Sequence, residues 1–227
     1  MGNAIDYFAY DNSLLSIKTR FSLKARKKMF DLFMKYISPS PTDEILDLGA
    51  TPDVLLADSN LFDKLYPYKD HLSVCSIEDC TNIVEQLHLK KFYFNKANEP
   101  LPFKDHEFKA VFCSAVLEHV GNRKKQEFFI NECLRIADNI FLTTPYRFFP
   151  VEMHTFFVFL HWLPWKAFQK IVLVTKGDFW ANTDNLNLCC KKDIMNMSLT
   201  HDVHIEFIHT VGMRSNMIIM RKTTDAT

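Results

Sequence analysis

The stretch EILDLGA, residues 44–50, decides the fold of this chain. It is a short, mostly apolar run with polar residues near its ends, which is typical of a strand buried on both faces of a parallel sheet. Gly49 and Ala50 follow where a loop leaves this strand. Ligands of open α/β sheets bind in the crevice outside the carboxyl ends of the strands. We therefore expect a ligand beside Gly49, because a residue without a Cβ lets the backbone approach closely.

The rest of the chain alternates strand-like and helical segments around this first strand. Amphipathic helices are expected over residues 21–37 and 122–137, and two strands over residues 204–210 and 213–222. Other strand-like runs cover residues 71–77, 91–95, 108–115 and 139–144. Strands that alternate with helices indicate an α/β fold whose sheet is mostly parallel, with right-handed crossovers. The last two strands are expected to close one edge of the sheet as an antiparallel pair.

The composition of the chain limits the kinds of partner and cell compartment that we expect. The 227-residue chain carries 27 Lys and Arg against 27 Asp and Glu, so no overall basic field attracts a nucleic acid. Six cysteines without CxxC spacing favour buried reduced thiols over a zinc site. The first fifteen residues, MGNAIDYFAYDNSLL, lack a positively charged start and a continuous apolar run, so we expect a cytoplasmic protein.

An aromatic segment, residues 145–174, interrupts the α/β pattern. Its apolar run over residues 156–165 is much shorter than the ~20 residues that a membrane-spanning helix needs. A hydrophobic lid, a dimer face or an interfacial patch in peripheral contact with a membrane would each explain it, and the lid is the simplest. We expect two regions: a helical arm or lid at 1–40, and a main domain at 41–227 with an insertion at about 145–175.

Four segments of the chain form a recognisable series. They are ILDLGATPD (45–53), SIED (76–79), ANEPLPFKDHEFKAVFCSAVLEHV (97–120) and NIFLTTPYRFFPVEMHT (139–155). Together they resemble the class I S-adenosylmethionine-dependent methyltransferases of the type 11 family. The resemblance covers roughly residues 40–160. It implies a Rossmann-like three-layer sandwich around a mostly parallel seven-stranded sheet with an antiparallel C-terminal edge pair. It also implies S-adenosylmethionine as cofactor and S-adenosylhomocysteine as product.

The resemblance implies a cofactor site at successive strand ends. Asp47 would hold the ammonium group of the cofactor, Glu78 or its neighbour Asp79 the ribose hydroxyls, and Asn98 the adenine amino group. Helix capping by the two acids and an ordinary turn at the asparagine are the alternatives. The full expected set is Asp47, Gly49, Ala50, Glu78, Asp79, Asn98, Ser114 and Ala115.

The loop after the first strand departs from the family pattern. The family has three glycines there, and this chain has only Gly49 within residues 49–53. Either the loop adopts another shape that still binds the cofactor, or binding is weakened or lost. We favour the first reading, because Asp47 and the downstream pattern remain.

Further residues are candidates for catalysis and for binding the methyl acceptor. The resemblance places Glu118 and His119 near the transferred methyl group, where the histidine is either a general base or a structural hydrogen-bonding residue. Acceptor-binding candidates after the fifth strand are Tyr146, Arg147, Glu152 and His154. The spacing of Glu152, His154 and His161 matches no metal-ligand template, so no metal is expected. Tyr7 and Tyr10 either cover the cofactor or pack on the sheet.

We expect methyl transfer to a small-molecule or lipid-linked acceptor, a lipid-linked glycan among the candidates. One alternative is a catalytically degenerate methyltransferase fold that acts as a binding or regulatory protein, which the single glycine would explain. Another is an RNA or protein methyltransferase that uses a basic face formed by Lys24, Arg26, Lys27 and Lys28. The sequence leaves the oligomeric state open.

Overall fold

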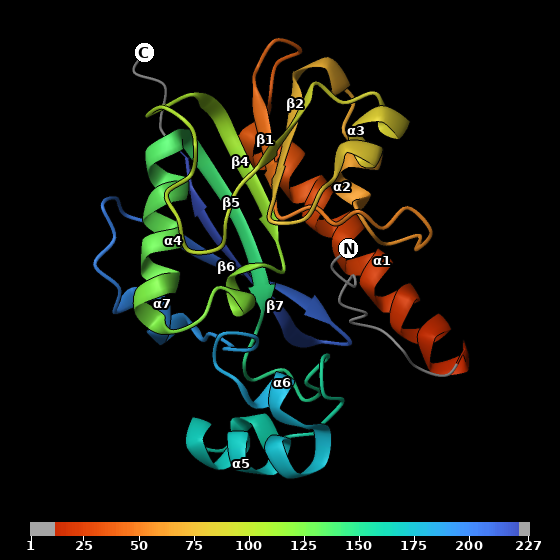
Figure 1. Ribbon diagram of the computed structural model, residues 1–227, viewed down its shortest axis with the longest axis vertical. Helices are drawn as coiled ribbons and strands as arrows, with labels where there is room; N and C mark the ends of the chain where they lie inside the picture. Colours follow the sequence, from red (N-terminus) through yellow and green to blue (C-terminus); the bar gives the residue numbers. More distant parts are fainter. Residues whose placement is uncertain (1–11, 223–227) are drawn as a thin grey trace.

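Seven strands form one mixed sheet in the computed structural model, which describes residues 12–222. The sheet order is β3-β2-β1-β4-β5-β7-β6 (Figure 1). The first five strands are parallel, and β7 is antiparallel to both β5 and β6. The bounds are β1 Ile45–Leu48, β2 Leu72–Ser76, β3 Lys91–Phe94, β4 Phe108–Ser114, β5 Ala137–Pro145, β6 His204–Thr210 and β7 Met213–Arg221. The predicted α/β fold with an antiparallel edge pair is confirmed.

Helices cover both faces of the sheet, which gives the predicted three layers (Figure 1). The α-helices are α1 Asn12–Ile37, α2 Leu61–Leu65, α3 Thr81–Leu87, α4 Arg123–Ile136, α5 Trp165–Lys176, α6 Asp178–Ala181 and α7 Lys191–Met195. Three short 3-10 helices are η1 Lys69–His71, η2 Leu117–His119 and η3 Leu160–Trp162. Helix α1 begins nine residues before the predicted start at residue 21. It ends where predicted, because Ser38 adopts a left-handed conformation before Pro39.

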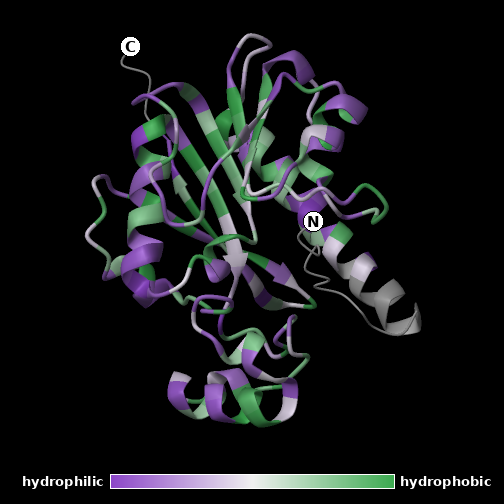
Figure 2. Ribbon diagram, in the orientation of Figure 1, coloured by the Kyte–Doolittle hydropathy of each residue, from purple (hydrophilic) through white to green (hydrophobic). Residues whose placement is uncertain are grey.

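Successive side chains of a strand point to opposite faces of the sheet, so the hydrophobic core has two parts, one on each face. Ile45 of β1 packs with α1, α2 and α3 on one face, whereas Leu46 packs with α4 and α7 on the other. Phe33 of α1 is fully buried and its ring meets those of Phe62, Phe112 and Phe141 edge to face. Figure 2 shows the hydrophobic strands between helices whose outer surfaces are hydrophilic.

The aromatic insertion forms a small cluster of its own, separate from the two faces of the sheet. Phe168 and Val172 of α5 are fully buried against Leu186 and Leu188, and Trp165 packs beside them. Helices α5 and α6 lie beyond the end of the sheet at which β5 finishes (Figure 1). Among the described residues, no helix combines the length and apolar character that crossing a bilayer requires.

Candidate active site

A cavity of about 580 Å³ opens at the carboxyl ends of the parallel strands. Its volume falls within the usual range of small-molecule and cofactor sites. Nine of the residues predicted to act in the site line it: Asp47, Gly49, Ala50, Glu78, Asn98, Ser114, Ala115, His119 and His154. Glu118, Asp79, Tyr146, Arg147 and Glu152 lie outside its lining.

Gly49 begins the floor of the cavity at the end of β1. Its φ of +97° is rarely adopted by residues with a side chain, and a Cβ built here would lie 2.2 Å from Cγ2 of Val116. Its N–H donates to the carbonyl of Cys75 in β2, 2.8 Å away. The residue is therefore glycine for two reasons, the backbone conformation and the close packing of the turn after β4.

Hydrogen bonds, rather than further glycines, shape the loop after Gly49. The side chain of Asn60 accepts from the N–H of Thr51 at 3.1 Å and donates to the carbonyls of Thr51 and Asp53 at 2.7 and 3.1 Å. The Asp53 carboxylate accepts from Ser59 Oγ and from the N–H of Leu55. The loop thus adopts a fixed conformation with one glycine.

We expect Asn60→Gly to destabilise the protein and to weaken ligand binding in the cavity. Asn60 has φ +49°, which glycine accepts without strain, so the variant removes the three side-chain hydrogen bonds and adds only the entropy that glycine gives to the unfolded chain. Their loss should cost about 2–3 kcal/mol, measured as the free energy of unfolding in urea. His88→Gly is the control, because His88 is exposed and also has a left-handed backbone, with φ +54°. An equal loss in both variants would contradict a special role of Asn60.

Two buried carboxyl groups and one cation lie at the Gly49 end of the cavity. Burial raises the pKa of Asp47 to about 7, although the charge of Arg26 opposes the shift. Burial, and then the charge of Asp47, raises the pKa of Asp63 well above its ordinary value. Asp63 faces Asp47, and the interaction between the two carboxyl groups lowers the pKa of Asp47 and raises that of Asp63, so the pair keeps a proton on Asp63. This end of the cavity therefore favours a bound cation, which would offset the cost of ionising Asp47.

The two predicted ribose-binding acids after β2, Glu78 and Asp79, have different surroundings. Glu78 lines the cavity, and its N–H donates to Ser76 Oγ at 3.2 Å. Asp79 is exposed, and its carboxylate accepts from the N–H and the hydroxyl of Thr81 at 2.9 and 2.6 Å. Asp79 thus caps the first turn of α3, which was the alternative reading for an acid at this position.

The segment after β3 forms the opposite end of the cavity. Asn98 and Leu101 both line the cavity there. Asn98 is exposed to solvent and has a left-handed backbone conformation, with φ +62°. Glu132 of α4 accepts from the N–H of Leu101 at 2.8 Å and pairs with Arg135 at 2.7 Å. Arg135 in turn donates to the carbonyls of Leu101 and Phe103. This network fixes the loop that carries Asn98 and Leu101 against α4.

The turn after β4 supplies the wall between these two ends. Ala115 has φ +59°, and its N–H donates to the carbonyl of Thr143 at 2.9 Å. Ser114 Oγ accepts from the hydroxyl of Thr143 at 3.0 Å. Helix η2 follows and carries Glu118 and His119 to the edge of the cavity.

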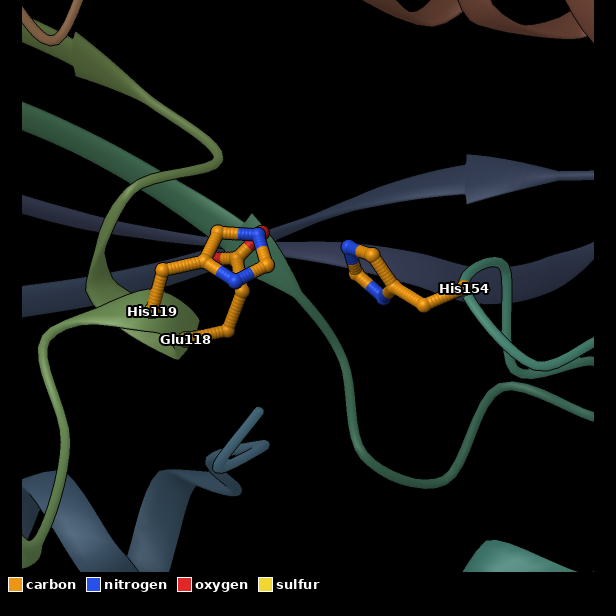
Figure 3. Close-up of side chains that lie close together, drawn as sticks. All are labelled: Glu118, His119 and His154. Carbon is orange, nitrogen blue, oxygen red and sulfur yellow. The ribbon is translucent and has the colours of Figure 1, made fainter. Parts of the chain in front are cut away.

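Glu118 and His119 meet His154 at this edge (Figure 3). Glu118 is fully buried, and its Oε2 accepts from Thr144 Oγ1 at 2.9 Å, whereas its Oε1 has no hydrogen-bond partner among the described residues. The rings of His119 and His154 stand edge to face with centroids 4.9 Å apart. Burial lowers the pKa of His119, so its imidazole is neutral at pH 7.

Glu152 supports His154 rather than facing the cavity. Its carboxylate accepts from Nδ1 of His154 at 2.6 Å and from the N–H and hydroxyl of Thr155 at 2.6 Å. Burial alone would raise the pKa of Glu152, but the charge of His154 and these hydrogen bonds lower it to about 2. Glu152 is thus a carboxylate that orients the histidine.

The other predicted residues of this region pack within the protein. The ring of Tyr146 lies against those of Phe148 and Phe207, and Arg147 donates to the carbonyl of Leu163. His161 is buried, and its Nε2 contacts the carbonyl of Phe149 at 2.7 Å. Tyr7 and Tyr10 lie outside the described residues.

Several lining residues were not anticipated from the sequence. Arg26 reaches the cavity from α1, Asp63 lies behind it in α2, and the aromatic residues Phe128 and Phe129 line it from α4. A signal for Arg26 did exist: it lies three and seven residues before Met29 and Phe33, which face the core. Of the four cations of the expected basic face, Arg26 lines the cavity and Lys27 pairs with Asp31.

Comparisons with known proteins agree with the fold. Residues 67–139 match a family model described as a methyltransferase domain. The sequence matches none of the curated proteins with which it was compared. Similar solved structures show the same fold at low sequence identity, as three examples illustrate.

The first is a possible histamine N-methyltransferase from Thermotoga maritima, with TM-score 0.53, 12% identity and 89% of each chain covered. The second is magnesium protoporphyrin IX methyltransferase from Synechocystis PCC 6803 with bound S-adenosylmethionine, with TM-score 0.52 and 10% identity, covering 88% of this chain and 80% of that one. The third is the YcgJ protein of Bacillus subtilis, with TM-score 0.52 and 14% identity, covering 81% and 71%.

Proposed function

We propose that this chain, which has the fold of the class I S-adenosylmethionine-dependent methyltransferases and matches a methyltransferase domain over residues 67–139, binds S-adenosylmethionine in the cavity at its strand ends. It transfers the methyl group to a small-molecule or lipid-linked acceptor. The ammonium and carboxylate of the cofactor lie at the Gly49 end, and the nucleoside extends toward Glu78 and Asn98.

One observation carries this proposal, the presence of Asp47 and Arg26 together in the cavity lining that includes Gly49. Both residues line the cavity, and the charge of Arg26 acts on Asp47. The methionine part of the cofactor has an ammonium and a carboxylate on one carbon, so it requires an acid and a base close together. The carboxylate of Glu78 can accept from both ribose hydroxyls, because it offers two oxygens on one rigid group.

The arm at residues 1–40 contributes to the same site in this proposal. Helix α1 places Arg26 at the cavity and packs Met29 and Phe33 against the sheet. The arm thus belongs to the cofactor site, and the main domain at 41–227 supplies the rest of it.

The reaction is an in-line displacement. A lone pair on the acceptor attacks the methyl carbon, the carbon–sulfur bond breaks with its electrons going to sulfur, and S-adenosylhomocysteine leaves. The proton of the acceptor passes to a base or to water. The cofactor supplies the reactive sulfonium, while the protein orients the two reactants and excludes water. His119 and His154 line the cavity beyond Ala115, on the side we assign to the acceptor.

The surface of the aromatic insertion supports an amphipathic acceptor. Apolar side chains there remain exposed to solvent, among them Phe148 at 43%, Phe159 at 51%, Trp162 at 42% and Val174 at 85%. The same insertion supplies His154 to the cavity, and an exposed apolar surface on such a segment suits a substrate that is delivered from a lipid surface. Peripheral contact with a membrane therefore belongs to the proposal.

Calorimetry tests the proposed cofactor. We expect S-adenosylmethionine and S-adenosylhomocysteine to bind with one-to-one stoichiometry, and adenosine without the amino-acid part to bind at least tenfold more weakly, because it lacks contacts with Asp47 and Arg26. Absence of binding at millimolar cofactor would overturn the proposal in favour of a degenerate fold. Transfer of radioactive methyl groups into lipid or aqueous cell extracts then distinguishes the two acceptor classes.

A further inference from the structure

Three side chains that can ligate a metal ion meet beside the acceptor side of the cavity, where two of them, His119 and His154, line it (Figure 3). Glu118 and His119 come from η2, and His154 comes from the loop after β5. We infer that Glu118, His119 and His154 bind a divalent transition-metal ion. The inferred role of the metal in catalysis rests on the proposed function, whereas metal binding itself does not.

The spacing of the three ligand atoms suits a single ion. All three lie within 4.8 Å of one another, and Nε2 of His119 is 3.9 Å from Oε1 of Glu118. A point no further than about 2.8 Å from each of the three atoms therefore exists. Metal–nitrogen and metal–oxygen bonds of this type measure about 2.0–2.2 Å, so shifts of less than about 1 Å complete the geometry.

Both histidines are held in the tautomer that ligation requires. Nδ1 of His119 is 2.6 Å from the carbonyl of Asn185, and Nδ1 of His154 is 2.6 Å from the carboxylate of Glu152. A carbonyl and an ionised carboxylate can only accept, so both Nδ1 atoms carry the hydrogen. In the neutral form of each ring the lone pair is on Nε2, so a metal ion at His154 would replace the proton that gives this ring its charge beside Glu152. An acceptor behind the second ring nitrogen is the usual arrangement of metal-ligating histidines.

Glu118 gives an independent indication of a ligand. Its carboxyl group is completely buried, yet Oε1 has no hydrogen-bond partner among the residues that the structure describes. An unsatisfied buried acceptor of this kind is costly, and a cation beside it would offset that cost. Thr144 holds Oε2 at 2.9 Å and leaves Oε1 on the side of His119.

The donor set indicates the class of metal. Two imidazole nitrogens and one carboxylate oxygen suit Zn²⁺, Co²⁺, Mn²⁺ or Fe²⁺ better than Mg²⁺ or Ca²⁺, which prefer oxygen ligands. Three protein ligands leave at least one coordination position for an oxygen of the acceptor. A bound metal would lower the pKa of a coordinated hydroxyl, which would lose its proton to water and so become the nucleophile at neutral pH. The inferred acceptor therefore carries a hydroxyl group at the reacting position.

The test uses Co²⁺ as the probe with protein that carries no affinity tag and has been treated with a chelator. We expect one Co²⁺ per chain by calorimetry, visible absorption bands typical of nitrogen and oxygen ligation, and displacement by Zn²⁺. Proton NMR of the Co²⁺ protein should show two shifted, exchangeable imidazole N–H signals, one from each histidine. Absence of Co²⁺ binding, or of both signals, would reduce the cluster to hydrogen bonding alone.

Variants locate the site. Glu118→Gln and His154→Gln keep the size of the side chain and should each weaken Co²⁺ binding at least tenfold. His204→Gln is the matched control, because His204 pairs with Glu206 at 3.3 Å on exposed positions of β6 and should not affect binding. Equal Co²⁺ affinity in all three variants would overturn the inference. Thermal unfolding followed by circular dichroism shows whether each variant is folded.

The same preparations separate this inference from the proposed function. Binding of Co²⁺ without S-adenosylmethionine would leave the metal site standing and remove the methyltransferase proposal. Binding of S-adenosylmethionine without Co²⁺ would do the reverse. Binding of both, together with loss of methyl transfer in the presence of the chelator, supports both.

Discussion

Replacement of Gly49 by alanine should abolish cofactor binding. The added Cβ would lie 2.2 Å from Cγ2 of Val116, in a backbone conformation with φ +97° that costs a residue with a side chain about 1–3 kcal/mol. Either the turn after β4 or the end of β1 must move, and both border the methionine end of the cavity. We expect affinity for S-adenosylmethionine to fall more than 100-fold by calorimetry.

Two further variants separate the clash from the strain. Gly212→Ala adds a methyl group at φ +75° in the turn between β6 and β7, where nothing lies within 4 Å, so it tests strain without a clash. Its cofactor affinity should equal that of the unaltered protein. Val116→Ala in combination with Gly49→Ala removes the clashing atom and should restore part of the affinity. No restoration would show that the conformation of Gly49, rather than its packing, is decisive.

Asp47→Asn should remove cofactor binding and stabilise the unliganded protein. Burial raises the pKa of Asp47 to about 7 without ligand, so ionising this carboxyl group at alkaline pH opposes folding. The folded-state pKa lies above the unfolded value, so the stability that the neutral form contributes is lost as pH rises from about 4 through 7. The unliganded variant should therefore melt at a higher temperature than the unaltered protein at pH 8, with a smaller difference at pH 5.

Ionisation of Asp47 lowers the stability of the unliganded protein, but it should raise the affinity for the cofactor. The ammonium group binds the carboxylate form of Asp47, so affinity should rise between pH 6 and pH 8 in the unaltered protein, as the pair of Asp47 and Asp63 loses a proton. Asp47→Asn should show weak binding with no such dependence on pH. Asp79→Asn is the control, because that carboxylate caps α3 outside the cavity. Equal losses in both variants would contradict the assignment of the ammonium to Asp47.

Local patterns predicted the sheet well, because they reflect local causes. The apolar runs at 44–50 and 108–115 correspond to β1 and β4 within a few residues, and the last two strands form the expected antiparallel pair. The start of α1 was missed because residues 12–20 show no apolar stripe as regular as that of residues 21–37.

The site was less predictable, because its residues come together only in the folded chain. Glu118 and His154 are 36 positions apart, so no spacing template could pair them. The acid at position 63 lies within a short helix with no motif around it, yet it faces Asp47. The sequence alone did not show how the loop after β1 keeps its shape with one glycine. In the structure the side chain of Asn60 forms hydrogen bonds with the backbone of this loop.

Because β7 lies between β5 and β6, the sheet can be completed only after β7 has been synthesised. β5 ends at Pro145, but the strand that covers its outer edge begins only at Met213. At a synthesis rate of about 5–20 residues per second, the interval to the end of β7 lasts roughly 4–15 seconds. During that time an apolar strand offers an unpaired edge to neighbouring chains. Slow codons within the insertion would prolong this exposure, so aggregation during expression should be sensitive to translation speed.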